Sequence, residues 1–462
     1  MKAYEKYQKT NIEWFSEIPD NWKVLRLKRL INPYKYYQIG DGDHGSIKPE
    51  MYQESGIPYF RVQNLSWDGK LDLDGIAFIS HKVHNENLKS RLLPGDILIA
   101  KTGATIGKLA YLDDSIEEGN TTSSVAKITI DKRSFEPKFF LYYFQLPEFK
   151  DQIWIDASQK SAQPGFNVDD LVDYSAPIPP LPEQRQIAAY LDYKTNQIDR
   201  FIANRKKQIE LLEEQVASHI NRLMSEGIKR NPTKQPTGIP YLPEIPTHWD
   251  LRKFVGLTKI LTCGLASTPD YVSEEEGVPF FSAQNCRPFR MDLSNYNYIK
   301  PELHKQLTKY KKPEKGDVLV TRVGAGIGQA CVIDTDLEFS VYVSLTHIRP
   351  TKEILSEYIV YFFNTEYSRQ LNFEGTVVGG GQGNLNVNNV AKYKMPLPPI
   401  DEQREIVLYL DEKRQEIGEL ISKYQKQIDL MQEYKTALIS KAVTGKIDVR
   451  EWQPKQTIKE TV

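Results

Sequence analysis

The feature that most constrains this chain is a long segment that its sequence contains twice. Residues 17–22, Glu-Ile-Pro-Asp-Asn-Trp, return 227 positions later as Glu-Ile-Pro-Thr-His-Trp at 244–249. Residues 56–60 and 95–98 return after 221 positions, and residues 167–187 return after 219 positions with 10 of 21 identical. Solenoid repeats are only about 20–50 residues long, so this period indicates two tandem copies of a whole module.

Each module is predicted to begin with a mixed domain of strands and helices. Short apolar runs between glycines and prolines, at 96–100 and 317–321, are typical of strands. The aromatic runs at 139–144 and 358–363 favour buried helices, although their length alone is also compatible with strands. The copies match at such framework motifs and diverge between them, so we expect one fold that presents two different surfaces.

Each module is predicted to end in a long helix. Residues 183–226 contain neither proline nor glycine, and their apolar side chains recur mostly at spacings of three and four. Such a helix would span roughly 66 Å at about 1.5 Å per residue, and it cannot bury its apolar seam alone. The second copy supplies the nearest partner of equal length, so we expect an antiparallel coiled coil within one chain.

The residues of this seam are also candidates for docking partner proteins. They are Ile187, Leu191, Ile198, Phe201 and Leu212 in the first helix and Ile406, Leu410, Ile417, Leu420 and Met431 in the second. Further apolar residues flank the seam and could dock partners or widen the seam: Ile202, Leu211, Ile421 and Ile428.

These patterns predict an α+β chain of two pseudo-symmetric modules. A proline-rich stretch at 177–182 ends the first mixed domain, Gly227 and Gly445 match the C′ glycines of helices, and four prolines in 228–244 favour a linker. The expected boundaries are a first mixed domain at 1–182, a helix at 183–227, a linker at 228–244, a second mixed domain at 245–400, a helix at 401–446 and a C-terminal tail at 447–462.

Composition excludes several classes of protein. The 462 residues include 60 Lys plus Arg and 61 Asp plus Glu, a net charge of −1, and no apolar run of 18 residues would cross a membrane. The first ten residues lack the apolar core of a secretory signal. Cys263, Cys286 and Cys331 have neither disulfide-framework nor zinc spacing, which favours a reducing cytoplasm. This neutral balance also differs from the basic balance of many DNA-binding proteins.

No catalytic motif in the sequence is complete. Residues 32–34, Asn-Pro-Tyr, lack one proline of the Asn-Pro-Pro-aromatic motif of adenine methyltransferases. Residues 103–108 resemble a P-loop, but three residues separate their glycines instead of four, and no Ser or Thr follows Lys108. His81 and His84 have no third ligand at metal-binding spacing. We therefore expect no catalytic residue, metal site or cofactor in this chain.

Three paired motifs carry a resemblance to a known family. They are Ile-Pro-x-x-Trp at 18–22, Gly-Asp-Ile-Leu at 95–98 and Pro-Pro-Leu-Pro-Glu-Gln-Arg at 179–185, each with a second copy. With these motifs the chain resembles the specificity (S) subunit of a type I restriction–modification system over nearly its whole length. The resemblance implies two target recognition domains, each reading one half of a bipartite site in double-stranded DNA. It also implies docking of two methyltransferase (M) subunits and of restriction/motor (R) subunits, which would hold S-adenosylmethionine, ATP and magnesium.

Residues that could read bases are sought where the two copies differ. Base reading in the major groove relies chiefly on Arg for guanine and on Asn or Gln for adenine. Such side chains occur in the divergent segments 34–48, 160–166, 287–290 and 379–384. Between 287 and 322, nine Lys and Arg stand against four acids, a pattern that suits phosphate contacts or a solvated charged face.

Other candidates lie where the copies agree. Gln63–Asn64 and Gln284–Asn285 follow a strand and could read bases or form turns, while Lys101 and Arg322 are equivalent and suggest contacts with the DNA backbone. The DNA-binding candidates are Arg61, Gln63, Asn64, Lys101, Lys160, Gln163, Gln284, Asn285, Arg287, Arg290, Arg322, Gln382 and Asn384.

The sequence therefore favours a non-catalytic DNA-specificity subunit of a bacterial-type cytoplasm. Two other classes stay open: a nuclease or methyltransferase with an unrecognised site, and a coiled-coil scaffold that never reads DNA. Activity of the purified chain alone on DNA would favour the enzyme. A footprint of two protected half-sites around an unprotected middle would exclude the scaffold.

Overall fold

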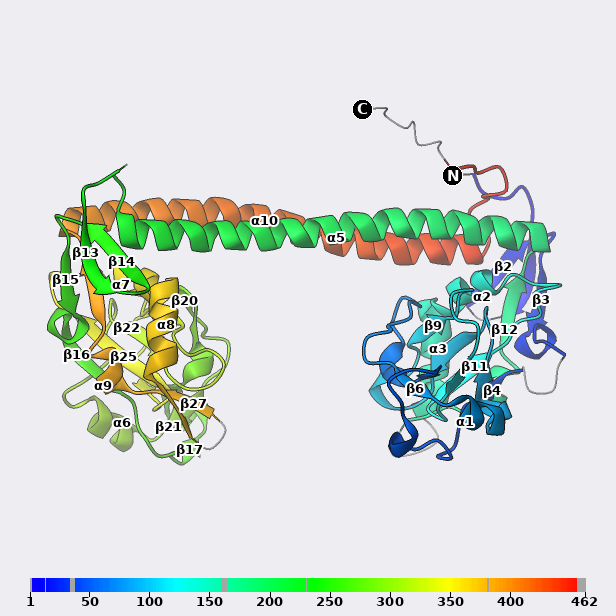
Figure 1. The fold of residues 1–462 in the computed structure, drawn as a ribbon, viewed down its shortest axis with the longest axis horizontal. Coiled ribbons are helices and arrows are strands. Elements are labelled where there is room, and N and C mark those ends of the chain that lie inside the picture. The colour runs from blue at the N-terminus through cyan, green and yellow to red at the C-terminus, as the bar shows by residue number, and fades with distance from the viewer. Residues whose placement is uncertain are drawn as a thin grey trace. The chain divides into compact units, whose positions relative to one another are not determined.

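The computed structural model, which describes residues 2–12, 14–33, 38–158, 164–229, 231–379 and 382–454, divides into two compact units. Unit 1 comprises residues 1–204 and 426–462, and unit 2 comprises residues 205–425. Each unit therefore combines one mixed domain with a segment of each long helix (Figure 1). The two mixed domains and the two long helices confirm the predicted fold class.

Unit 1 is built on two four-stranded sheets, ordered β6-β5-β10-β7 and β4-β11-β8-β9. Its strands are β1 (Tyr7–Ile12), β2 (Phe15–Pro19), β3 (Lys23–Arg26), β4 (Gly40–Asp41), β5 (Ile57–Phe60), β6 (Ala77–Ile79), β7 (Arg91–Leu92), β8 (Ile97–Ala100), β9 (Leu109–Tyr111), β10 (Gly119–Thr121), β11 (Val125–Ile128) and β12 (Ser175–Ile178). Its helices before the long helix are α1 (His81–Glu86), α2 (Pro137–Phe144), α3 (Pro147–Ser158) and α4 (Val168–Leu171).

Unit 2 repeats this plan with sheets ordered β17-β21-β18-β24 and β16-β25-β22-β23. Its strands are β13 (Lys234–Ile239), β14 (Leu242–Pro246), β15 (Asp250–Lys253), β16 (Thr258–Cys263), β17 (Tyr271–Val272), β18 (Val278–Phe281), β19 (Cys286–Arg287), β20 (Arg290–Met291), β21 (Asn297–Ile299), β22 (Val318–Thr321), β23 (Ala330–Val332), β24 (Ser340–Val341), β25 (Leu345–Pro350), β26 (Thr376–Gly379), β27 (Gln382–Leu385) and β28 (Lys394–Leu397). Its shorter helices are α6 (Pro301–Thr308), α7 (Ser356–Phe363), α8 (Glu366–Gly375) and α9 (Val387–Val390).

The sequence repeat corresponds to a repeat of topology. The predicted strands are β8 and β22, which lie at equivalent places in their sheets, and the aromatic runs form the buried helices α2 and α7. In each unit one strand pair is parallel, β5 with β10 and β18 with β24, while the neighbouring pairs are antiparallel. The edge strands differ, with β7 added in unit 1 and β17 in unit 2.

The two long helices are α5 (Leu181–Glu226) and α10 (Ile400–Val443), and they pair in antiparallel fashion within each unit. In unit 1 Asp199 of α5 forms an ion pair with Lys435 of α10, at 2.7 Å. In unit 2 the Arg205 guanidinium lies 4.5 Å from the ring centroid of Tyr424. Arg205 and Tyr424 occupy equivalent positions of the repeat, so the two long helices contact each other there through the same position of the module.

One predicted boundary needs correction. Most of segment 228–244, predicted as a linker, forms the hairpin of β13 and β14 and belongs to unit 2. This hairpin is the counterpart of β1–β2 and has the same register shift, because a Thr-x-Ile motif occurs in both first strands and each threonine hydroxyl donates to the chain across the turn. The four prolines thus lie in and around strands rather than in a free linker.

The C-terminal tail, predicted at 447–462, packs onto unit 1 where the structure describes it. Ile447 and Val449 are buried, and the amide of Asp448 donates to the carbonyl of Lys2 at 2.9 Å. The ring of Trp452 lies 5.1 Å from that of Tyr190 in α5. The apolar side chains of Ile447 and Val449 supply this packing.

A repeated joint connects each mixed domain to its long helix. In unit 1 Trp22 donates its indole N–H to Glu183 at 2.8 Å, and in unit 2 Trp249 donates to Glu402 at 3.1 Å. Both tryptophans are 1% exposed. The joint therefore explains why the Ile-Pro-x-x-Trp and Glu-Gln-Arg motifs recur together, since one motif supplies the donor and the other supplies the buried acceptor.

The Gly-Asp motif forms a buried turn whose electrostatics differ between the copies. The carboxylates of Asp96 and Asp317 each accept a backbone N–H three residues earlier. Burial raises the pKa of Asp96 to about 6. Burial also raises the pKa of Asp317, but hydrogen bonds from His347 and Arg349 outweigh it and leave that pKa below its usual value.

These opposite shifts predict opposite pH effects on stability. Because the folded pKa of Asp96 is raised, ionisation of this carboxyl costs stability as pH rises from about 4 through about 6. Asp96→Asn should therefore stabilise the chain by about 3 kcal/mol at pH 8 and little at pH 4. Asp317 stabilises the fold above the usual carboxyl pKa and loses this contribution as pH falls, so Asp317→Asn should destabilise at pH 8. Urea unfolding at both pH values measures this, and equal effects of the two variants would contradict it.

Candidate nucleic-acid interface

The two equivalent cations after the Gly-Asp strands are buried. Lys101 is 8% exposed and forms an ion pair with Asp41 at 2.7 Å. Arg322 is 7% exposed and donates to the carbonyl of Leu385 and to the side-chain oxygen of Asn384, both at 2.9 Å. Their repetition therefore reflects structural positions, and the observed burial argues against the predicted contacts with the DNA backbone.

The Gln-Asn pairs separate into a structural and an exposed member. Asn64 and Asn285 are 0% exposed, and each side chain closes a turn by accepting one backbone N–H and donating to a backbone carbonyl. Gln63 and Gln284 are exposed. The turn interpretation is therefore the better one for both asparagines, while both glutamines stay available to a ligand.

In unit 1 two of the candidates converge on one backbone carbonyl. The guanidinium of Arg61 donates to the carbonyl of Gly75 at 3.1 Å, and Gln63 donates to the same carbonyl at 3.4 Å. Arg61 also lies 5.5 Å above the ring of Tyr52. Arg61 is therefore held by neighbours on two sides, whereas the Gln63 amide is only weakly held.

In unit 2 the hairpin of β19 and β20 brings two arginines together. Arg287 and Arg290 are directly paired across the hairpin, and both are exposed. Arg287 forms an ion pair with Asp292 at 3.3 Å, and the contacts that the structure describes include none for the guanidinium of Arg290. Arg290 is consequently the strongest base-reading candidate among the described residues.

Part of the basic stretch around this hairpin is neutralised by acids from elsewhere in unit 2. Lys312 contacts Glu338, and Lys315 lies 3.3 Å from Asp336. Lys300 and Lys305 are exposed. The stretch is therefore a mixed surface with a few available cations rather than a continuous basic patch.

The divergent loops are only partly described. Lys160 and Gln163 lie outside the described residues, and the side chain of Gln382 does as well. Asn384 is exposed on β27, which pairs with β26 in an antiparallel hairpin that follows α8 in the chain. Its bond with Arg322 brings two predicted residues together.

All ten predicted seam residues are buried or half-buried along the helices. Ile187, Leu191, Ile198, Ile406, Leu410 and Ile417 are buried, and Phe201, Leu212, Leu420 and Met431 are half-buried. Of the flanking residues, Ile202 and Ile428 are also buried, and Ile421 is half-buried. Leu211 is 51% exposed, so among these four it alone presents most of its side chain to solvent.

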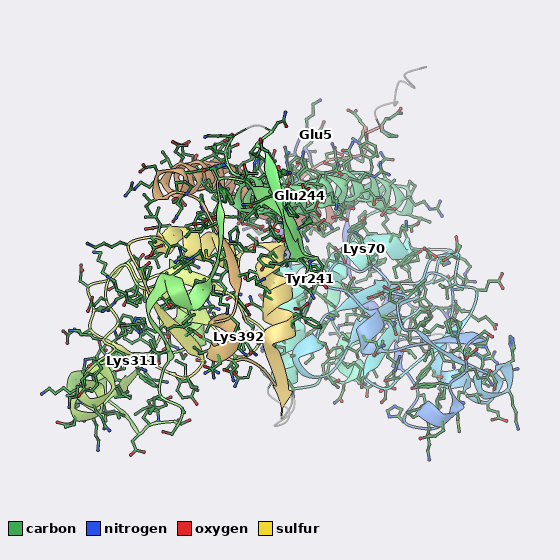
Figure 2. All side chains as sticks on the ribbon, turned by 60° about the vertical axis from the view of Figure 1, so that its left-hand side comes forward. Glu5, Lys70, Tyr241, Glu244, Lys311 and Lys392 are labelled. Carbon is green, nitrogen blue, oxygen red and sulfur yellow. The ribbon has the colours of Figure 1, made fainter. Side chains whose placement is uncertain are left out.

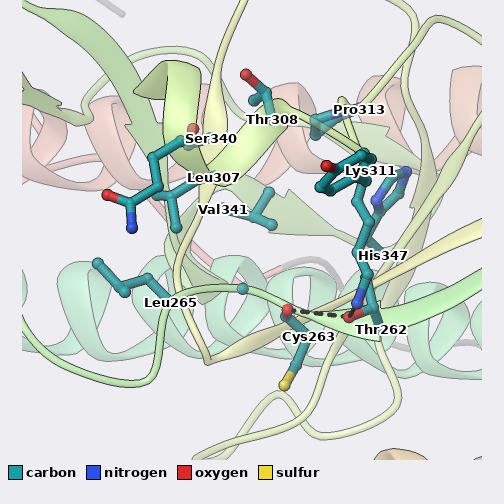
Figure 3. Close-up of a pocket in the computed structure, with 13 residues that line it drawn as sticks. Thr262, Cys263, Leu265, Leu307, Thr308, Lys311, Pro313, Ser340, Val341 and His347 are labelled. Atoms are coloured by element: carbon teal, nitrogen blue, oxygen red, sulfur yellow. Dashed lines mark hydrogen bonds between the residues drawn. The ribbon is translucent and has the colours of Figure 1, made fainter. Parts of the chain in front are cut away.

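A cavity of about 360 Å³ in unit 2 lies apart from the predicted residues (Figure 3). It is lined by the end of β16, the end of α6 and His347, and Lys311 at its side donates to the hydroxyl of Thr262 at 2.9 Å. None of the thirteen DNA-binding candidates lines it. Within the described part of the chain, no cluster of three metal-binding side chains occurs, and no helix is long and apolar enough to span a membrane.

Comparison with known proteins agrees with this architecture. The family described as type I restriction modification DNA specificity domain matches the chain twice, at residues 19–211 and 248–438. A Methanocaldococcus jannaschii protein described as the type I restriction enzyme MjaVIII specificity subunit is 22% identical, over 94% of this chain and 94% of its own length. The EcoBI specificity subunit of Escherichia coli is 23% identical, over 86% of this chain and 80% of its own length.

Two solved structures share the fold. One chain comes from work on complex assembly and conformational transition of the type I R-M system, with a TM-score of 0.70, 17% identity and coverage of 93% of this chain and 99% of that chain. The HsdS subunit of Thermoanaerobacter tengcongensis has a TM-score of 0.51 and 18% identity, and covers 93% of this chain and 98% of its own.

Proposed function

Because the chain belongs to the family of type I restriction–modification DNA specificity subunits, we propose that it reads a bipartite, asymmetric site in double-stranded DNA. Each mixed domain is then a target recognition domain for one half-site, and the paired helices set the distance between the half-sites. The chain is not itself catalytic. It docks two M subunits and R subunits in the cytoplasm, and S-adenosylmethionine, ATP and magnesium belong to those partners.

One observation carries this proposal: the two units share their framework and differ at their exposed polar side chains. The sheets, the buried turns and the Trp–Glu joints recur, whereas the Arg287–Arg290 hairpin of unit 2 has a Trp-Asp-Gly-Lys turn at the corresponding place in unit 1. Sequence is read by hydrogen bonds to base edges. Different donors on one scaffold therefore favour two different half-sites.

The near-zero net charge fits this role when DNA is held by the whole complex. Non-specific affinity for DNA comes mainly from phosphate contacts by Lys and Arg. With 60 basic and 61 acidic residues and several lysines neutralised by neighbours, this chain supplies few such contacts. We expect weak binding of random DNA by the isolated chain and tight binding only with its M subunits.

Replacing Arg290 by Ala is expected to weaken reading of one half-site only. Loss of one bidentate arginine–guanine contact costs about 1–3 kcal/mol, roughly 5- to 160-fold in affinity for the cognate site. Methylation by the assembled complex on cognate DNA and on sites mutated in either half measures this. Lys392→Ala, an exposed change elsewhere in unit 2, is the matched control. Equal losses for both half-sites, or for both variants, would contradict base reading by Arg290.

Two exposed leucines at equivalent helix positions are candidates for the M-subunit contact. Leu211 of α5 is 51% exposed and Leu430 of α10 is 53% exposed, and the two are related by the 219-residue shift. A partner present in two copies should meet the same side chain twice. Leu211→Glu with Leu430→Glu is expected to lower M-subunit affinity at least about tenfold in co-purification titrations, with the exposed Gln215→Glu as control. Unchanged stoichiometry and affinity would remove these residues from the interface.

A further inference from the structure

Two of the contacts between each target recognition domain and the helix pair can be compared across the repeat. The first is the Trp–Glu joint, which is the same in both units. The second is the turn that follows the Gln-Asn pair, residues 66–71 in unit 1 and 287–291 in unit 2. This second contact is built from different chemistry in the two units.

In unit 1 the turn is held by ion pairs. Lys70 of the turn lies 2.7 Å from Asp199 of α5, and Lys435 of α10 lies 2.7 Å from the other oxygen of the same carboxylate. Asp68 of the turn is 3.4 Å from Lys70 and 3.8 Å from Lys435. We call these four residues the ionic latch (Lys70 is labelled in Figure 2).

The ionic latch borders a cavity rather than a packed apolar contact. The cavity has a volume of about 500 Å³, and all four latch residues line it. Its other walls include Tyr142 of α2, Lys138 and Asp192, which form their own polar contacts between the domain and α5. Ion pairs next to such a water-accessible space are weakened by dissolved salt.

In unit 2 the corresponding turn inserts an aromatic ring. Arg414 of α10 stacks on Phe289, with the guanidinium carbon 3.5 Å from the ring centroid, and the ring of Tyr361 lies 5.1 Å from that of Phe289. The hydroxyl of Tyr361 donates to Asp411 at 2.6 Å and accepts from Arg414 at 3.3 Å. We call these four residues the aromatic latch.

The backbone at Phe289 shows that this ring placement is enforced. Its φ is +66°, in the left-handed region that a bulky residue adopts rarely and at a cost. The surrounding contacts hold it there: its own N–H donates to the carbonyl of Ala330 at 2.9 Å, between the paired residues Arg287 and Arg290. Strain of this kind persists only where neighbouring structure over-determines the conformation.

We propose that the two latches are positioning elements that fix the angle of each recognition domain on the helix pair, and that only the ionic latch releases as salt rises. One consequence rests on the proposed function. At high salt the recognition domain of unit 1 is held less rigidly than that of unit 2, so its half-site is read with less fixed geometry. Lys435 and Phe289 act through the domains they hold and do not touch DNA.

Electron–electron distance measurements on the full chain test the latches without DNA. The background variant is Cys263→Ser. A first double variant has spin labels at Asp74→Cys and Arg200→Cys and reports on unit 1. A second has labels at the equivalent exposed positions, Ser294→Cys and Glu419→Cys, and reports on unit 2. Between about 0.05 M and about 0.5 M NaCl we expect the distance distribution of unit 1 to broaden and that of unit 2 to stay narrow.

Matched variants separate a latch from general loss of structure. Lys435→Ala should broaden the unit 1 distribution at both salt concentrations, Lys435→Arg should restore it, and the exposed Lys441→Ala should have no effect. Phe289→Ala should broaden only unit 2. A narrow unit 1 distribution in Lys435→Ala, or equal salt response of the two units, would overturn the proposal.

A DNA readout links the latch to site spacing and keeps the two proposals distinguishable. In the assembled complex, Lys435→Ala should lower the preference for the correct spacer over one that is a base pair too long. We expect this preference to fall by about tenfold, because a domain that is no longer fixed on the helices can adjust to a displaced half-site. If the complex bound DNA without any half-site preference, the proposed function would fail while the salt-dependent distances would still support the latch. Unchanged spacer discrimination with broadened distances would overturn the positioning role.

Discussion

Glu183→Ala is expected to lower the free energy of unfolding of unit 1 by about 4 kcal/mol. The Glu183 carboxylate is buried and accepts hydrogen bonds from the Trp22 indole at 2.8 Å, the Tyr4 hydroxyl at 2.5 Å and the Asn21 amide at 3.0 Å. Removing it leaves buried donors without an acceptor, which costs more than the net value of each bond. Urea unfolding of the full chain, followed by tryptophan fluorescence, measures the loss.

Related variants grade this effect. Glu183→Gln keeps the size and one acceptor oxygen, so its loss should be smaller, about 2 kcal/mol. Glu402→Ala in unit 2 should also cost less than Glu183→Ala, because Glu402 accepts from Trp249 and His248 only, among the contacts described. Asp173→Ala removes an exposed carboxylate and is the control. A Glu183→Ala variant as stable as the control would show that the joint does not hold the domain to its helix.

Insertion of one helical turn in both long helices is expected to change the spacing of the DNA site. One turn adds about 5.4 Å and a base pair occupies about 3.4 Å, so the unread spacer should lengthen by one to two base pairs. The exposed positions after Lys207 in α5 and after Lys426 in α10 are equivalent and keep the helices matched. On the original site, methylation should fall at least about 100-fold, because both half-sites can no longer be engaged together.

The control for this insertion replaces the residues at the insertion points without changing the length of the helices. Alanine at Lys207 and Lys426 should leave the original spacer preferred. Selection of methylated sites from a library of spacers measures the preference. An insertion variant that still prefers the original spacer would contradict the role of the helices as a ruler.

Much of this fold could be predicted because it depends on repeated local signals. The spacing of apolar residues predicted α5 and α10, and glycines at 227 and 445, with φ of +76° and +73°, end them as expected of C′ glycines. The prediction of a linker at 228–244 was wrong because its prolines were interpreted as residues that interrupt secondary structure. The Thr-x-Ile motif within this segment is a second copy of the motif in β1 and indicates a strand. The described part of the tail packs on unit 1 through long-range contacts such as Trp452–Tyr190, which no local pattern encodes.

The candidate site was harder to predict because residue type does not reveal burial. Lys101, Arg322, Asn64 and Asn285 have the chemistry of DNA contacts, but the fold uses them internally. Their presence in both copies was the available signal, since residues that read different half-sites should differ. The joint of Trp22 and Glu183 was missed as an interaction although both motifs were identified, because 161 residues separate the two side chains.

The position of Phe289 shows a further limit of sequence reasoning. A phenylalanine between two arginines gives no hint of a left-handed backbone, and its partner Arg414 lies on a helix more than a hundred residues away. Only the folded arrangement brings these groups together. Likewise, the net charge alone does not say which lysines are available to DNA. The structure shows that individual lysines form ion pairs with acids of the same unit.

Mapping methylated adenines in the host genome, with and without the gene for this chain, tests the central claim most directly. We expect a motif of two different half-sites separated by a fixed, unread spacer, and complete loss of this methylation when the gene is deleted. A single continuous motif, a palindromic motif, or a bipartite pattern that persists after deletion would contradict it.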